Sequence, residues 1–121
     1  MNVVIADDSK ILSERLIEML AEISGINIVG QAATGFEAID LIEKHHPDAV
    51  LLDIRMPSGN GIDVLNTLKR IGCSPVIIML TNFPLPQYRK LCRNAGADYF
   101  FDKSNDFEKV FDILIDMSHN Y

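Results

Sequence analysis

Residues 49–53 read Ala49-Val50-Leu51-Leu52-Asp53, four apolar residues followed at once by an acid. Similar short apolar runs recur at residues 3–6, 26–29, 76–80 and 99–101. Runs this short and this rich in β-branched residues are typical of strands buried on both faces, as in parallel sheets. We therefore expect five buried strands.

The segments between these runs carry apolar residues at helical spacing. The apolar positions are Leu12, Leu16, Met19, Leu20 and Ile23; Ala38, Ile39 and Ile42; Ile62, Leu65 and Leu68; Tyr88, Leu91, Cys92 and Ala95; and Phe107, Val110, Phe111 and Leu114. Each set forms one stripe that faces a core. Thr34 and Glu37 indicate a capping box, and Gly25, Gly72 and Gly96 are expected C-terminal caps. The alternation predicts an α/β fold: a flavodoxin-like, doubly wound parallel sheet in the order 2-1-3-4-5, with helices on both faces.

Composition bounds the class of protein. A chain of 121 residues predicts one domain over residues 1–121. Its formal net charge of -6 argues against direct nucleic-acid binding. It has neither an apolar run long enough for a membrane span nor a basic leader. Cys73 and Cys92 lie far apart and read as free thiols of a reducing compartment. We expect a cytoplasmic protein with no membrane contact.

Polar side chains follow four of the expected strands. Asp7 and Asp8 come after the first run, Asp53 after the third, Thr81 after the fourth, and Asp102 and Lys103 after the fifth. Singly, each suits the capping of a following helix. Jointly they meet at one edge, because ligands of such sheets bind beyond the carboxyl ends of the strands.

Three clustered carboxylates predict a cation. Two unit charges about 4 Å apart repel by roughly 4 kcal/mol at an effective dielectric constant near 20. One lysine cannot offset three such groups, whereas Mg²⁺ prefers oxygen ligands and keeps several waters. We predict a Mg²⁺ site at Asp8 and Asp53, with Asp7 oriented through water.

The same residues suggest phosphoryl transfer. Such chemistry needs an in-line nucleophile and positive charge around three equatorial oxygens, and carboxylates serve as phosphoryl acceptors. Asp53 is the expected acceptor because it is central in the edge and precedes a Gly-rich loop. Lys103 and the metal would hold two of the oxygens, and the Thr81 hydroxyl the third.

Over its whole length, the chain resembles the receiver domain of two-component response regulators. The motifs that carry the resemblance are Asp7-Asp8, Gly35-x-Glu37-Ala38, Asp53-x-x-Met56-Pro57-x-x-Asn60-Gly61, Thr81, Ala95-Gly96-Ala97-Asp98 and Lys103. The resemblance implies that Asp53 takes phosphate from a phosphohistidine of a sensor histidine kinase or a phosphotransfer protein. It also implies that the backbone carbonyl of Arg55 completes the protein ligands of the metal.

The resemblance further implies a switch. Thr81 would move toward the phosphoryl group and Phe100 would turn inward, remodelling a surface of the fourth helix, fifth strand and fifth helix that binds a downstream protein. Simple core filling is the alternative role for Phe100.

Departures from the family concern the rim of the site. Ser104 follows Lys103 where many receivers have proline, so a trans peptide is expected. Asp102 is expected to compete for the charge of Lys103, and Asn82 to narrow access. Arg55 and Phe83 flank the path of the water that would hydrolyse the aspartyl phosphate. We therefore expect an unusual lifetime of the phosphate, which could be either longer or shorter than in other receivers.

The segment Asn82-Phe83-Pro84-Leu85-Pro86 is a stiff apolar entry to the fourth helix. We expect exposed Phe83 and Leu85 and a part in partner binding; alternatively, Pro86 only occupies a first helical position.

Several functions fit these residues. The first is a binding module controlled by phosphorylation; a relay intermediate that passes the phosphoryl group on, or a fragment of a longer DNA-binding regulator, would look the same. A magnesium-dependent phosphatase of the haloacid-dehalogenase type is disfavoured because Arg55 stands where that enzyme needs an acid. A flavin binder is disfavoured because two acids follow the first strand.

Overall fold

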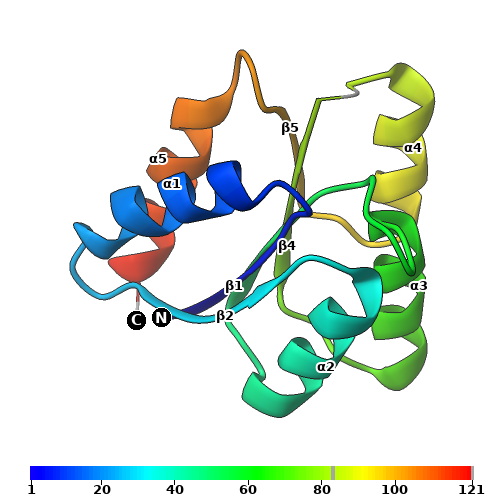
Figure 1. The fold of residues 1–121 in the computed structure, drawn as a ribbon, viewed down its shortest axis with the longest axis horizontal. Coiled ribbons are helices and arrows are strands. Elements are labelled where there is room, and N and C mark those ends of the chain that lie inside the picture. The colour runs from blue at the N-terminus through cyan, green and yellow to red at the C-terminus, as the bar shows by residue number, and fades with distance from the viewer. Residues whose placement is uncertain (83, 121) are drawn as a thin grey trace.

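The computed structural model describes residues 1–82 and 84–120, and it shows strands and helices in strict alternation (Figure 1). The elements are β1 (Asn2–Ala6), α1 (Lys10–Ala21), β2 (Asn27–Ala32), α2 (Gly35–His45), β3 (Ala49–Leu52), α3 (Gly61–Ile71), β4 (Val76–Thr81), α4 (Pro86–Asn94), β5 (Tyr99–Asp102) and α5 (Phe107–Ser118). The five strands pair in parallel in the order β2-β1-β3-β4-β5. The predicted fold and strand order are confirmed.

Helices cover both faces of the sheet, with α1 and α5 on one side and α2, α3 and α4 on the other (Figure 1). Successive residues of a strand point to opposite faces, so β1 serves two cores. Val3 and Ile5 pack in the core with α1 and α5. Val4 and Ala6 pack in the core with α2 and α3. Because both faces are covered, all four residues of β3 are buried.

The edge strand β2 runs further than its apolar residues predict. It continues to Ala32 and pairs with β1 through an irregularity between Val3 and Val4. An edge strand keeps part of its surface in water, so Gln31 is tolerated there exposed. The prediction that this strand stops near residue 29 was therefore wrong, because it rested on buried apolar runs alone.

The helix ends agree only partly with the predicted caps. Gly72 is the C-cap of α3 in the left-handed conformation. Gly96 follows the C-cap Ala95 of α4 in the left-handed region, with φ of 105°. The Ala97 N–H donates to the Cys92 carbonyl at 2.9 Å and the Gly96 N–H to the Arg93 carbonyl at 3.1 Å, so Gly96 ends the helix as predicted. The helix α1 instead ends at Glu22, and Gly25 lies three residues beyond that cap. The Thr34 hydroxyl oxygen accepts the Glu37 N–H as expected. The full reciprocal capping box is at Asn60 and Asp63.

The helix α4 has the smallest share of the core. Leu91 was expected to face the core, but its side chain is 49% exposed. Among the nine residues of α4, Cys92 is the buried one, and the N-cap Leu85 makes no side-chain capping bond. Pro86 does begin the helix, as the sequence predicts.

No helix within the described part of the chain is long and apolar enough to cross a membrane.

Candidate functional site

The backbone ladder of the sheet brings Asp7 and Asp53 together. The Asp53 N–H donates to the carbonyl of Ala6, and the Asp7 N–H donates to the carbonyl of Ala32, each at 2.9 Å. Parallel pairing therefore continues one residue beyond β1 and β3. Both side chains end up buried at the carboxyl edge of the sheet, as the strand order predicts, whereas Asp8 is exposed.

Lys103 joins these two acids. Its Nζ atom lies 2.6 Å from Oδ2 of Asp7 and 3.1 Å from Oδ2 of Asp53, and its side chain is 8% exposed. The Lys103 N–H donates to the carbonyl of Thr81 at 2.9 Å, which ties the end of β5 to the end of β4. A buried cation held by two carboxylates is the centre of the site. The direct pair between Lys103 and Asp7 was not predicted from the sequence.

Three acids form a cluster whose size suits one ion. One carboxylate oxygen each of Asp7, Asp8 and Asp53 can be chosen so that all lie within 4.8 Å of one another. Both oxygens of Asp7 are engaged, Oδ1 with the Ser9 N–H at 2.8 Å and Oδ2 with Lys103. An all-oxygen donor set with one exposed acid at its mouth fits Mg²⁺. The engaged oxygens of Asp7 fit a ligand that acts through water.

The Asp8 side of the cluster is open. A hollow of about 200 Å³ is bordered by Asp7, Asp8, Lys10, Gln31 and Glu37. The hollow lies beside the start of α1 and the end of β2, and of the three clustered acids it borders Asp7 and Asp8.

Burial dominates the electrostatics of Asp53. Burial raises its pKa above the ordinary value, and the charge of Lys103 opposes this more than the charge of Asp7 adds to it. The Ile54 N–H, which donates to Oδ1 at 2.7 Å, also favours the ionised form. Burial by itself lowers the pKa of Lys103, but its hydrogen bonds and charge pairs with Asp7 and Asp53 outweigh this and raise it. Lys103 is therefore held protonated.

Thr81 and Phe100 lie on the two neighbouring strands. Thr81 ends β4, is fully buried, and is paired in register with Asp102. Phe100 is half-buried in β5 and packs against the core under α4. The guanidinium carbon of Arg89 lies 4.7 Å from the centre of the Phe100 ring. Sequence reasoning missed this contact, because nothing in the helical spacing of α4 marks Arg89.

The loop after Asp53 packs closely against its surroundings. Arg55 is exposed and Met56 is buried. A Cβ atom on Gly35 would lie 2.2 Å from the carbonyl oxygen of Gly59, so the start of α2 abuts this loop directly. Gly35 is thus needed for the close approach of backbone to backbone.

The residues on either side of Lys103, Asp102 and Ser104, depart from the family pattern. Asp102 does not compete for Lys103: its oxygens accept the Ser104 N–H and the Asn105 side-chain amide, each at 2.9 Å. That expectation was wrong because neighbouring residues at a strand end point to opposite sides. The described peptide bonds are all trans, including that of Ser104.

Other expected features concern the approach to α4. Asn82 is exposed, and Leu85 is 43% exposed, as predicted. Phe83, expected to be exposed and to flank the water path, lies outside the described residues.

Comparison with known proteins identifies the family. The sequence model of the response regulator receiver domain matches residues 3–115. The transcriptional regulatory protein PdtaR of Mycobacterium tuberculosis is 39% identical over 95 residues, which are 78% of this chain and 45% of PdtaR. The chemotaxis protein CheY of Halobacterium salinarum is 31% identical over 115 residues, covering 95% of this chain and 94% of that protein. The chain spans about half the length of PdtaR and of DesR from Bacillus subtilis.

Solved structures agree with the sequence matches. The receiver domain of the putative regulator NarL from Mycobacterium tuberculosis superposes with a TM-score of 0.89 at 26% identity, covering 99% of this chain and 97% of that one. A complex of CheX, CheY, BeF3 and Mg²⁺ from Borrelia burgdorferi matches with a TM-score of 0.81 at 30% identity, covering 94% and 89%. On its fold, its acidic edge and these likenesses, the chain belongs to the response regulator receiver domain family.

Proposed function

We propose that Asp53 accepts a phosphoryl group from a phosphohistidine of a sensor histidine kinase or a phosphotransfer protein. The observation that carries this proposal is the buried contact of 3.1 Å between Asp53 Oδ2 and the Lys103 ammonium. Oδ1 is fixed by the Ile54 N–H, so Oδ2 is the attacking atom in this proposal. The bond from Oδ2 to phosphorus forms as the phosphorus–nitrogen bond breaks, and the imidazole leaves with the electron pair and takes up a proton.

The chain's own residues prepare this step. Lys103 supplies a fixed positive charge beside the attacking oxygen, where the charge of the phosphoryl oxygens develops. Thr81 would donate its hydroxyl to one of those oxygens. Asp7 holds Lys103 in place through the contact of 2.6 Å. These groups would orient and neutralise the phosphoryl group without breaking a further bond.

Magnesium completes the proposed site. Asp8, Asp53 and the backbone carbonyl of Arg55 would hold Mg²⁺, and Asp7 would orient it through water. When bound, the ion supplies positive charge that offsets the carboxylates and the incoming phosphoryl oxygens. The acidic cluster supports this assignment, and the Borrelia CheY complex contains Mg²⁺.

The proposed output is a change of surface. A phosphoryl group adds up to two negative charges at Asp53 and would draw Thr81 toward it. Phe100 would then turn inward, remodelling the surface formed by α4, β5 and α5 for a downstream protein. The bond from the Lys103 N–H to the Thr81 carbonyl supports communication between the pocket and β5.

The domain would catalyse only its own phosphorylation and dephosphorylation. Arg55, two residues after Asp53, cannot act as a general acid at neutral pH. We expect residues 1–121 to form one receiver domain that works in the cytoplasm, where Cys73 and Cys92 remain as free thiols. The unusual phosphate lifetime remains a prediction from the sequence, based on Arg55 and Phe83.

Incubation with acetyl phosphate and Mg²⁺, followed by intact mass, tests the proposal. We expect a gain of one phosphoryl group that is lost in Asp53→Asn and when Mg²⁺ is chelated. Asp48→Asn is the matched control, because Asp48 accepts the Asn2 N–H outside the acidic cluster. Retention of the mass gain in Asp53→Asn, or its loss in Asp48→Asn with an intact fold, would contradict the assignment of Asp53.

A further inference from the structure

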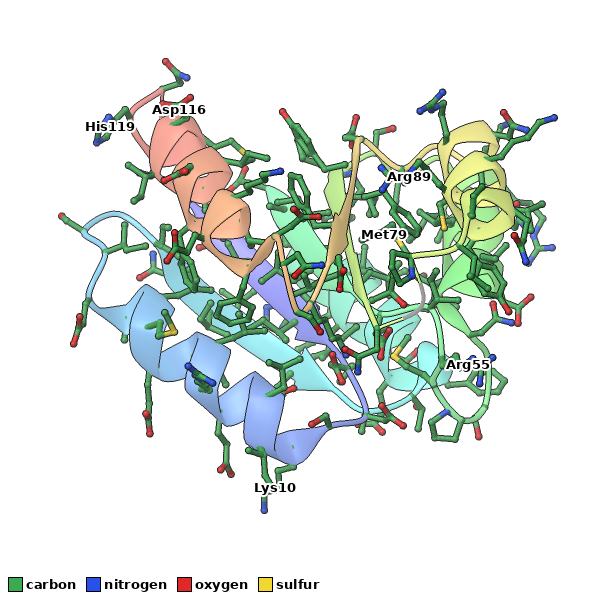
Figure 2. All side chains as sticks on the ribbon, turned by 90° about the horizontal axis from the view of Figure 1, so that it is seen from above. Lys10, Arg55, Met79, Arg89, Asp116 and His119 are labelled. Carbon is green, nitrogen blue, oxygen red and sulfur yellow. The ribbon has the colours of Figure 1, made fainter. Side chains whose placement is uncertain are left out.

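The outer edge of β5 carries a hollow that the proposed phosphoryl chemistry does not use. It has a volume of about 280 Å³ and is lined by Arg89 and Arg93 of α4 and by Asp98, Tyr99, Phe100 and Phe101 at β5. Since β5 is the last strand of the sheet, one of its edges has no strand partner. Figure 2 shows Arg89 between α4 and β5. We call this region the α4–β5 hollow.

The hollow is locally basic on an acidic protein. The chain has a formal net charge of -6, yet the nine residues of α4 read PQYRKLCRN, with three cations and no acid. Arg89 and Arg93 are four residues apart and therefore share one face of the helix. The ion pairs of the described residues involve other lysines, namely Lys10, Lys103 and Lys109.

Acidic side chains near the hollow are already engaged. One oxygen of Asp98 accepts the Ile77 N–H at 2.8 Å, so this carboxylate is turned toward β4. Asp106, at the start of α5, accepts the Asp102 N–H and pairs with Lys109. Arg89 itself donates one N–H to the Phe100 carbonyl at 3.3 Å. The charge of Arg89 also contributes to lowering the pKa of Asp106, after the Asp102 N–H and Lys109. A guanidinium carries five N–H donors and binds carboxylates through two parallel bonds.

An apolar platform borders the same edge. The rings of Tyr99 and Phe101 stack with centres 6.0 Å apart and planes 17° apart, and Tyr99 is 39% exposed. A ligand lying along β5 would meet cations on one side and this aromatic pair on the other. An extended segment with alternating acidic and apolar residues presents these two kinds of side chain to opposite sides.

We propose that the α4–β5 hollow binds an extended acidic segment of a partner protein, with its carboxylates on Arg89 and Arg93 and its apolar side chains on Tyr99 and Phe101. A protein is favoured over nucleic acid because three cations on a net acidic chain offer too little charge for a phosphate backbone. This inference rests on the proposed function, in that it names the chemistry of the downstream partner.

Arg89 gives the hollow a connection to Phe100. Its guanidinium covers the Phe100 ring and bonds to the Phe100 carbonyl. A partner carboxylate that draws Arg89 away would uncover the ring and make its proposed inward turn easier. Because coupling between two sites is reciprocal, a phosphorylated pocket would bind the acidic segment more tightly.

A peptide titration followed by amide chemical shifts tests this inference. The probe is a synthetic peptide in which glutamate and phenylalanine alternate. The control is a peptide of the same length in which lysine and phenylalanine alternate. We expect the acidic peptide to shift signals of α4 and β5, more tightly after acetyl phosphate and Mg²⁺ are added, and the basic peptide to shift none. Arg89→Gln with Arg93→Gln should weaken binding about tenfold or more, as expected for two lost charge-assisted contacts. Arg70→Gln, in the last turn of α3, should leave it unchanged.

Several outcomes would overturn the inference. Equal binding of the two peptides, shifts confined to α1 and α2, or undiminished binding by the double variant would each do so. Concentration-dependent shifts of α4 and β5 without peptide would assign the hollow to a second copy of the chain. Intact mass is measured on the same samples. A mass gain without peptide binding overturns this inference alone, and peptide binding without a mass gain overturns the proposed function alone.

Discussion

A Cβ atom on Gly61 would lie 2.2 Å from the carbonyl oxygen of Asp53. The same glycine begins α3, and its N–H donates to the Ile54 carbonyl at 2.7 Å. The helix therefore starts against the backbone of the proposed phosphoacceptor. Any side chain at position 61 must push that backbone away.

We accordingly expect Gly61→Ala to lower the free energy of unfolding by about 1–3 kcal/mol, as overpacking does, and to slow phosphorylation of Asp53. Gly72→Ala is the comparison, because its Cβ would meet nothing within 4 Å and only its left-handed backbone, with φ of 80°, is penalised. That variant should lose about 1 kcal/mol and phosphorylate normally. Urea denaturation and the rate of mass gain measure both. Normal phosphorylation of Gly61→Ala would show that the backbone there tolerates displacement.

Asp53→Asn should stabilise the metal-free protein near neutral pH. The pKa of Asp53 is raised by burial, so the folded state binds its proton more tightly than the unfolded state. The cost of ionising Asp53 is therefore absent at low pH and grows as the pH rises above the ordinary value of 3.8. Urea denaturation in a chelator should show a gain for Asn at about pH 7 that shrinks toward pH 3.8. A loss of stability at neutral pH would mean that the pair with Lys103 outweighs burial.

Lys103→Met should leave two buried carboxylates without their cation. The raised pKa of Lys103 means that its contribution is present below the ordinary value of 10.5 and is lost only as the pH rises through the higher folded value. Removing one member of such a buried pair costs about 3–5 kcal/mol. Added Mg²⁺ should stabilise the variant more than the natural protein, because a cation no longer competes for Asp53. Thermal melts with and without Mg²⁺ measure this.

The control for Lys103→Met is a substitution of an exposed lysine that also pairs with an aspartate. Lys109 pairs with Asp106, but its side chain is 64% exposed. Lys109→Met should change stability by less than about 1 kcal/mol and leave the Mg²⁺ response as it was. Equal Mg²⁺ responses of the two variants would argue against competition in the pocket.

Substitution of two serines, Ser13 within α1 and its N-cap Ser9, should change stability in opposite directions. The hydroxyl of Ser13 is buried and has no hydrogen-bond partner among the described residues. Ser13→Ala should therefore raise the free energy of unfolding by about 1 kcal/mol, because an unsatisfied polar group is removed. The Ser9 hydroxyl accepts the Leu12 N–H as the N-cap, so Ser9→Ala should cost about 1 kcal/mol. Urea denaturation of both variants measures these changes. Destabilisation by Ser13→Ala would imply that the Ser13 hydroxyl makes a hydrogen bond in solution.

The sequence predicted most of the fold because buried strands and amphipathic helices leave clear patterns. The run Ala49–Leu52 is entirely buried, as its composition requires. The end of β2 was missed because an edge strand tolerates Gly30 and Gln31, which carry no apolar signal. Leu91 was misjudged because α4 covers only the edge of the sheet, where the inner face of a helix is narrow.

The site was predictable as far as strand order fixes it. Asp7 and Asp53 meet because β1 and β3 are neighbours, and the long side chain of Lys103 reaches both from the end of β5, on the far side of β4. Which acid holds the lysine depends on side-chain rotamers, which a one-dimensional pattern does not encode. The same limit explains why Asp102 was wrongly expected to compete, and why Arg89 over Phe100 was not foreseen.

The shallow seating of α4 has an energetic consequence. Cys92 is the buried residue of the helix, and Tyr88 is half-buried against the same core, so lifting or re-angling the helix uncovers less apolar area than for the other helices. Segments with so few interior contacts open locally well before a domain unfolds. The element that bears the arginines is thus the one that a partner can reshape with the smallest loss of native packing, and a signal arriving there need not strain the central strands.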